Sequence, residues 1–348
     1  VNRLTLRNLQ FKNVKVTGVT AGIGIASKAA VNCQDITIEN CIFDVPDYGI
    51  VFDADVGSIE NISIAGNKFR INWGSAIGVG GVVKEIAISN NIIELLGDLP
   101  DLSLDTGVGI GVKTVDGTST TNAPTDITIT GNVFIGPTSR TLIAAISLAN
   151  YTNNVTVTGN TFRECTHAFY NNFSGTGANN VCFANNVIKD CDNGYTADTS
   201  TDVEPVITGN TFRDCTIGIK STLNHAVVSG NKFVDIAQQA IYGVSPMESA
   251  MISGNVFQRI GREAIFMATD SASNEICSIT GNMFSECCIG TDNTYNVIDL
   301  NNQYHIVLVD YNYRSCEFSF PAIMDGNNPK TISSACCTQT LDPNTIGF

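Results

Sequence analysis

Four carboxylates lie within one segment of the sequence, and paired carboxyl groups can act as a general acid and a general base. Residues 94–107 hold Glu94, Asp98, Asp101 and Asp105. Glycoside hydrolysis uses one protonated and one ionised carboxyl group, about 5–9.5 Å apart, on either side of the scissile bond. We therefore predict that Asp101 and Asp105 are the catalytic pair, with Asp98 as the substitute.

Basic and aromatic residues complete the predicted site. Lys113 or His167 has the basicity to remove the C5 proton of a uronic acid, and Arg140 would then neutralise the substrate carboxylate. A lyase is therefore an alternative to a hydrolase, although acids outnumber bases in residues 94–107. The full set predicted to bind substrate is Trp73, Lys113, Arg140, His167, Tyr170, Lys220 and Tyr242.

An Asn-centred repeat must position these residues. The pattern apolar-x-apolar-x-Gly/Asn-Asn-x-Phe/Ile recurs with its second Asn at 67, 91, 132, 160, 186, 210, 231, 255 and 282, so the intervals are 21–28 residues with one of 41. Strict alternation predicts a strand with one buried face, and the Gly-Asn step predicts a turn. Small apolar pairs such as Ala168-Phe169 predict a third strand. The sequence thus predicts an all-β solenoid, a single-stranded parallel β-helix with three strands per rung and about 11–12 rungs. A leucine-rich repeat is disfavoured because its Leu framework is missing.

The third strand of each rung should present a regular outward column. That column reads Gly24, Val51, Gly78, Gly111, Ser147, Tyr170, Thr196, Lys220, Tyr242 and Phe266. A glycine floor lets a sugar ring approach the backbone, and aromatic faces stack on sugar C–H surfaces. Alternatively, the glycines relieve crowding and the tyrosines are ordinary strand residues.

Two further columns are predicted to be structural. Cys165, Cys191, Cys215 and Cys287 occupy a slot that is Ile in other rungs, which indicates buried thiols rather than a metal site. The column Glu164, Asp190, Asp214 and Asp235 is expected to be neutralised by Arg163, Lys189 and Arg213 rather than by Ca²⁺. No cofactor is therefore predicted; a calcium ion is possible, but no motif supports it.

Composition narrows the class of protein. The 348 residues are 43% hydrophobic and 15% charged, which excludes intrinsic disorder. The net charge of −14 argues against nucleic acid and anionic membranes as partners. No apolar run reaches the roughly 20 residues of a membrane span. The repeat is lost after Tyr304, so we expect a β-helix domain over residues 1–304 and a C-terminal cap or oligomerisation segment over 305–348.

The rung Val155-x-Val157-x-Gly159-Asn160-x-Phe162-x-x-Cys165-x-x-Ala168-Phe169 and its copies resemble the pectate-lyase-like superfamily over roughly residues 3–304. This resemblance implies a right-handed coil and a complex or acidic polysaccharide bound along the third strands. The Asn-Thr-Asp and Arg-x-x-Lys signatures of polygalacturonases and pectate lyases are missing. The rung style is similar to that of phage tailspikes, which implies a homotrimer on a virion or another extracellular surface, acting on a bacterial surface glycan. Hydrolysis is the expected activity; a lyase, a C5-epimerase and a non-catalytic adhesin or structural spike are the alternatives.

Overall fold

The computed structural model describes most of the repeat region. The described residues are 3–12, 21–27, 32–45, 48–72, 74–96, 108–113, 123–137, 144–149, 152–172, 180–197, 204–244, 249–267, 277–287, 297–299, 306–309, 312–314 and 323–324. All regular structure in these residues is β-strand, and the chain forms two compact units, residues 1–187 and 188–348. No helix in the described part is long and apolar enough to cross a membrane.

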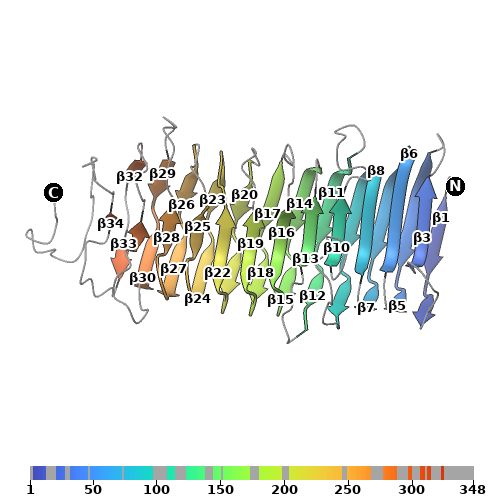
Figure 1. Ribbon diagram of the computed structural model, residues 1–348, viewed down its shortest axis with the longest axis horizontal. Coiled ribbons are helices and arrows are strands. Elements are labelled where there is room, and N and C mark those ends of the chain that lie inside the picture. Colours follow the sequence, from blue (N-terminus) through green and yellow to red (C-terminus); the bar gives the residue numbers. More distant parts are fainter. Residues whose placement is uncertain are drawn as a thin grey trace, which may run out of the picture. The chain divides into compact units, whose positions relative to one another are not determined.

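The first unit is a stack of parallel coils, each made of three successive strands (Figure 1). Strands β6 (Tyr48–Ala65) and β8 (Ser75–Ser89) are long because each serves as the third strand of one coil and continues as the first strand of the next. The other first strands are β1 (Leu4–Arg7), β4 (Cys33–Glu39), β11 (Thr125–Thr130), β14 (Asn153–Thr158) and β17 (Val181–Ala184). The second strands are β2 (Gln10–Lys12), β5 (Ile42–Val45), β7 (Lys68–Ile71), β9 (Ile92–Leu95), β12 (Val133–Ile135) and β15 (Thr161–Arg163). The other third strands are β3 (Ala21–Ser27), β10 (Val108–Lys113), β13 (Ala144–Ala149) and β16 (His167–Asn172).

The second unit repeats this arrangement, and strand β18 (Val187–Lys189) begins at the boundary. Its first strands are β20 (Val206–Thr208), β23 (Val227–Ser229), β26 (Met251–Ser253), β29 (Cys277–Thr280) and β32 (Ile306–Val309). Its second strands are β21 (Thr211–Arg213), β24 (Lys232–Ile236), β27 (Val256–Ile260), β30 (Met283–Cys287) and β33 (Asn312–Arg314). Its third strands are β19 (Asn193–Ala197), β22 (Ile217–Ser221), β25 (Ile241–Gly243), β28 (Ile265–Met267), β31 (Ile298–Asp299) and β34 (Ile323–Met324).

These strands confirm the predicted right-handed parallel β-helix. The described residues contain twelve second strands, one for each coil, in agreement with the expected 11–12 rungs. Strands β32, β33 and β34 lie in the segment expected to form a cap, and they pair in parallel with β29, β30 and β31. The other residues of 305–348 lie outside the described residues, so the domain boundary at 304 stays a prediction.

The core is built from stacked, inward-facing apolar side chains. In the first unit, the Phe11, Phe43 and Phe69 rings follow one another at 4.9 and 4.7 Å between centroids, within 7° of parallel. In the second unit, four successive Phe rings stack at 4.9–5.0 Å; they are Phe212, Phe233, Phe257 and Phe284. These separations match the roughly 4.8 Å spacing of paired strands, so equivalent side chains lie directly above one another.

The repeated Asn forms a buried amide ladder inside the turn between first and second strands. The side chain of Asn91 donates from Nδ2 to Asn132 Oδ1 at 2.9 Å, and Asn132 donates to Asn160 Oδ1 at 3.0 Å. Each amide also donates to a backbone carbonyl, as Asn132 does to Ile88 at 2.9 Å. The ladder provides hydrogen-bond partners for the polar groups of this buried turn, which would be costly to leave unpaired.

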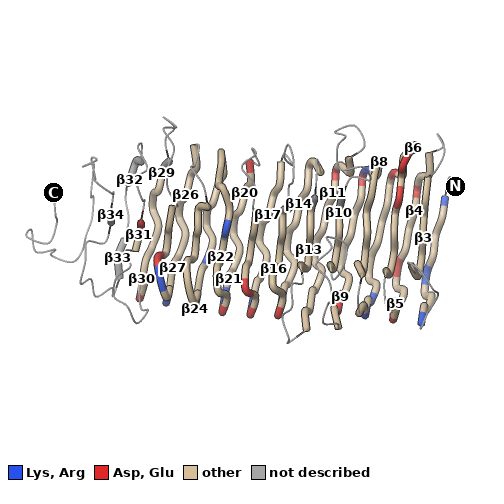
Figure 2. Tube along the Cα trace, viewed as in Figure 1, with Lys and Arg blue, Asp and Glu red and all other residues tan. Residues whose placement is uncertain are grey.

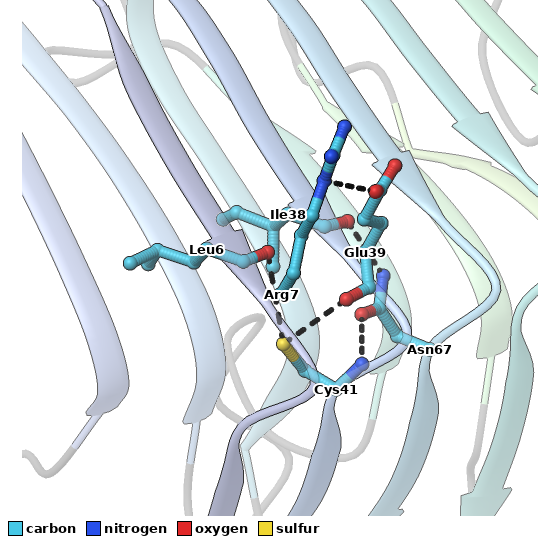
Figure 3. Close-up of polar contacts among 6 residues, drawn as sticks. All are labelled: Leu6, Arg7, Ile38, Glu39, Cys41 and Asn67. Carbon is cyan, nitrogen blue, oxygen red and sulfur yellow. Dashed lines mark hydrogen bonds and ion pairs between the residues drawn. The ribbon is translucent and has the colours of Figure 1, made fainter.

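The ladder ends at Cys41 near the N-terminus (Figure 3). Asn67 Oδ1 accepts a hydrogen bond from the Cys41 backbone N–H at 2.9 Å, and Asn67 Nδ2 donates to the Ile38 carbonyl at 2.9 Å. Cys41 has no side-chain amide that could continue the ladder. Its thiol donates to the Glu39 carbonyl at 3.4 Å instead.

The acidic column at the outer turn has a backbone cause. Glu164, Asp190, Asp214 and Asp235 all have φ between 53° and 57°. Asp tolerates this left-handed region better than most residues. The expected neutralisation is present at Lys189 and Asp190, which lie 3.3 Å apart. Asp235 instead receives two hydrogen bonds from Arg259, the longer at 2.8 Å, so one ion pair here joins successive coils rather than chain neighbours.

The cysteine column is confirmed as buried. Cys165, Cys191, Cys215 and Cys287 are at most 6% exposed. The Cys191 thiol donates to the Lys189 carbonyl at 3.4 Å, and the Cys215 thiol donates to the Arg213 carbonyl at 3.3 Å. Charged residues gather mainly toward the strand ends (Figure 2), which leaves the strand faces largely uncharged.

Candidate functional site

The outward side chains of the third strands, here called the third-strand face, follow the predicted register in the first unit. Gly78 pairs with Gly111, Gly111 with Ser147, and Ser147 with Tyr170. The intervening inward residues Ile77, Ile110, Ile146 and Phe169 are fully buried. Alternation along each strand therefore places this column outside, as expected.

The glycines of the third strands fall into two groups with different causes. A Cβ added to Gly109 would lie 2.4 Å from the Ala145 carbonyl oxygen, so this inner glycine relieves crowding. A Cβ added to Gly78 would find its nearest atom at 3.7 Å, and one at Gly24 would find nothing within 4 Å. Packing does not require glycine at positions 24 and 78. This favours the interpretation that these glycines let a sugar ring approach the backbone over the interpretation that they relieve crowding.

His167 and Tyr170 lie together on the third-strand face of the first unit. Both side chains are partly exposed, and their ring centroids are 4.7 Å apart with planes inclined by 31°. Both come from β16 and are three residues apart, and the two residues between them, Ala168 and Phe169, are fully buried. This contact between the two rings was not predicted from the sequence.

The other residues predicted for the first unit cannot be placed as side chains. Asp98, Asp101 and Asp105 lie outside the described residues, as do Trp73 and Arg140. The backbone of Lys113 ends β10 and pairs with Gly80. Catalysis by the three aspartates, and their position over the third-strand face, stay predictions.

In the second unit, the third-strand face carries aromatic and charged side chains in one column. Lys220 pairs with Tyr242, Tyr242 with Phe266, and Phe266 with Asp299. All four side chains are partly exposed, whereas the inward Ile241 and Ile265 are fully buried. The Tyr242 and Phe266 ring centroids are 5.3 Å apart with planes inclined by 53°. This pair offers an apolar surface at which a sugar ring can stack.

A buried polar pair lies beside these rings, at the turns that enter β25 and β28. Gln239 is 9% exposed and Glu263 is 4% exposed, and Gln239 Nε2 donates to Glu263 Oε2 at 3.0 Å. Each precedes a fully buried alanine, Ala240 or Ala264. At the equivalent Gly218, an added Cβ would lie 2.5 Å from the Ala240 carbonyl oxygen, which shows how closely the coils approach here.

The environment of Glu263 favours its neutral form. Burial raises the pKa of the Glu263 carboxyl, and the charge of nearby Asp299 raises it further. The hydrogen bonds from its own backbone N–H and from Gln239, and the positive charge of Arg262, act in the opposite direction and lower this pKa. Burial and a neighbouring carboxylate charge both favour the protonated form of a carboxyl group.

We call Lys220, Gln239, Tyr242, Glu263, Phe266 and Asp299 the aromatic–acid segment. Sequence reasoning identified Lys220 and Tyr242 and noted Phe266, but it missed Gln239, Glu263 and Asp299. The sequence does contain a signal for Glu263. It is the one carboxyl among the residues that precede the small apolar pairs: His167, Asn193, Ile217, Gln239 and Glu263. Its burial is not shared by the equivalent His167, Asn193 and Ile217, which are partly exposed.

Comparison with known proteins gives a family match and a distant structural neighbour. Residues 105–320, more than half of the chain, match the family model described as periplasmic copper-binding protein (NosD). One similar solved structure is a mannuronic acid specific polysaccharide family 6 lyase enzyme from human gut microbiota. The two share 11% sequence identity with a TM-score of 0.42, over 89% of this chain and 84% of that chain. No curated protein matches the sequence.

Proposed function

The chain belongs to the NosD family, and we propose that it binds a polysaccharide on the third-strand face outside the cytoplasm. One observation carries this proposal. A buried, hydrogen-bonded carboxyl, Glu263, lies beside a second carboxyl, Asp299, and an exposed aromatic pair on one regular face. Carbohydrate sites commonly combine aromatic rings, which stack on sugar C–H surfaces, with fixed polar groups that hydrogen-bond the sugar hydroxyls. The periplasmic description of the family supports the extracytoplasmic location.

The copper named in the family description does not fit the described residues. Within them, no three His, Cys, Asp or Glu side chains group in a way that would hold a metal ion. The Cys215 thiol is also a poor ligand, because burial raises its pKa and metal binding requires the thiolate. We therefore derive no step of the proposed function through copper.

The same face supports hydrolysis of the bound glycan as the finer proposal. Glu263 would donate its proton to the glycosidic oxygen as the bond from that oxygen to C1 breaks. A water molecule would then attack C1 and give its proton to Asp299, so that one proton leaves Glu263 and one arrives at Asp299. The environment of Glu263 favours the neutral form that this role requires.

An assay on a panel of neutral, acidic and amino polysaccharides tests this proposal. We expect new reducing ends with the wild type, and at least about a 100-fold lower rate with Glu263→Gln, because general acid catalysis contributes about that much. Glu204→Gln removes an exposed carboxylate elsewhere in the second unit and should keep the wild-type rate.

Other products would identify another activity. Absorbance of unsaturated uronates would indicate a lyase, and altered composition without shortening would indicate a C5-epimerase. Binding without any product would indicate an adhesin. If the wild type binds none of the polysaccharides, the proposed function fails. The role of Asp98, Asp101 and Asp105, a homotrimer and a tailspike-type place on a virion remain separate proposals that rest on the sequence pattern.

A further inference from the structure

We infer that the first-strand face of the second unit binds the same face of a second copy of this chain, in a two-fold symmetric dimer. This face consists of the outward side chains of β20, β23, β26 and β29. It is separate from the third-strand face, so the inference goes beyond the proposed function. A row of exposed apolar side chains on an uncharged surface carries it.

Three apolar side chains follow one another in register on this face. Val206 pairs with Val227, and Val227 pairs with Met251, so neighbouring members lie about 4.8 Å apart. Val206 is 38% exposed, Met251 is 42% exposed, and Val227 is partly exposed. The inward residues of the same strands are fully buried, so the core does not need the outward row. Apolar residues that are exposed side by side, rather than singly, are a feature of interaction sites.

A row of hydroxyl side chains lies beside the apolar row. Thr208 pairs with Ser229, Ser229 with Ser253, and Ser253 with Thr280. The hydroxyl oxygens of Thr208 and Ser229 are hydrogen-bonded to each other at 3.2 Å. A hydroxyl group has one donor and two acceptor sites, so each keeps capacity for a further hydrogen bond. The same row on a second copy offers matching donors and acceptors.

The first strands are also the uncharged strands of the second unit. The described first strands β20, β23, β26, β29 and β32 contain no charged residue, whereas β21, β24, β27, β30 and β33 each contain one or more. The third strands carry Lys220 and Asp299. Strands β20 and β26 are accordingly tan in Figure 2. The centre of a protein interface is typically depleted of charged residues and enriched in Met, which matches this face.

The charge of the chain identifies the partner. With a net formal charge of −14, two copies repel each other over most of their surfaces. This repulsion is weakest where both contacting faces are uncharged. A two-fold contact uses the same patch on both partners, so the patch must be complementary to itself. An apolar row beside a hydroxyl row meets this requirement, whereas a row of like charges would not.

Sedimentation equilibrium over a series of protein concentrations tests the inference. We expect a reversible monomer–dimer equilibrium for the wild type. Met251→Lys should weaken dimerisation at least about tenfold, because the contact would then contain a charge without a partner. Val227→Lys, at the centre of the apolar row, is a second variant with the same expected effect.

Met283→Lys is the matched control. It makes the same substitution on the second strand of the next coil, where Met283 is partly exposed and pairs with Val256. It changes the net charge of the chain as much as Met251→Lys does, and it should keep the wild-type dissociation constant. Thermal melts followed by far-UV circular dichroism confirm that each variant is folded.

Several results would overturn the inference. A wild type that stays monomeric at every concentration would do so, as would a trimer, the oligomer expected from the sequence pattern. A wild-type dimer that persists in the folded Lys variants of Met251 and Val227 would show that the contact lies elsewhere on the chain. Equal weakening by Met283→Lys would show that net charge, and not the first-strand face, governs the association.

Discussion

Replacing one buried ladder amide tests the stacked register on which the fold depends. In Asn132→Ala, three hydrogen bonds donated by Nδ2 are lost, to the Ile88 carbonyl at 2.9 Å, to Asn160 Oδ1 at 3.0 Å and to the Thr130 carbonyl at 3.2 Å. Oδ1 also stops accepting from the Asn91 backbone N–H and the Asn91 Nδ2, both at 2.9 Å. Asn91 is fully buried, so neither of its donors regains water without local opening.

The expected cost follows from these five hydrogen bonds. A buried hydrogen bond contributes about 1 kcal/mol net, and a buried donor left without its partner costs about 1–3 kcal/mol. We therefore expect Asn132→Ala to lower the free energy of unfolding by about 4 kcal/mol. That is a large part of the 5–15 kcal/mol typical of folded domains.

Urea unfolding followed by far-UV circular dichroism measures this loss. Asn61→Gly is a suitable control, because Asn61 is exposed, makes one side-chain bond to Asp35 at 3.3 Å and has a φ of 56° that glycine accepts freely. The control should lose less than about 1 kcal/mol. If Asn132→Ala loses no more than the control, the amides do not form a buried ladder, and the coils are not in the stated register.

Three further predictions concern glycine packing and acidic residues. Gly109→Ala should cost about 1–3 kcal/mol in urea unfolding because its Cβ would meet a carbonyl oxygen at 2.4 Å, whereas Gly78→Ala should change stability by no more than about 0.5 kcal/mol. The pKa of Glu263 is raised by burial, so the folded state binds the proton more tightly and stability falls as pH rises from the ordinary Glu value through the raised one; Glu263→Gln should remove this fall, and thermal melts across that pH range would measure it. The pKa of Asp235 is lowered, first by its hydrogen bond from Arg259, so its contribution is present above the ordinary Asp value and is lost on acidification; Asp235→Asn should therefore destabilise the protein at neutral pH and not at low pH. An Asp235→Asn variant with wild-type stability at both pH values would show that this ion pair contributes nothing.

The periodic part of the molecule could be predicted from the sequence. The single Asn of each repeat and the strict alternation around it determine which side chains point inward, because successive side chains of a strand point to opposite faces. The pairing of Gly78 with Gly111 and of Tyr242 with Phe266 follows from that rule. The buried Cys215 follows too, because Ile occupies the same slot in other coils.

The candidate site departs from that periodicity, and this is why it was only partly predicted. Glu263 is buried, whereas the residues at the equivalent positions His167, Asn193 and Ile217 are partly exposed, so the repeat pattern alone does not identify it. Asp299 was missed because ten residues separate β30 from β31, against four between β27 and β28, so the third strand of this coil is not at its usual distance from Asn282. Residues 97–107 have no repeat to fix them, so the roles of the aspartates there rest on residue type alone.

A crystal structure with a bound oligosaccharide tests the central claim most directly. We predict that a sugar ring lies against Tyr242 and Phe266, with its polar groups hydrogen-bonded to Glu263 or Asp299. An oligosaccharide ordered on the first-strand or second-strand faces instead, with the aromatic–acid segment left in solvent, would contradict the proposed function.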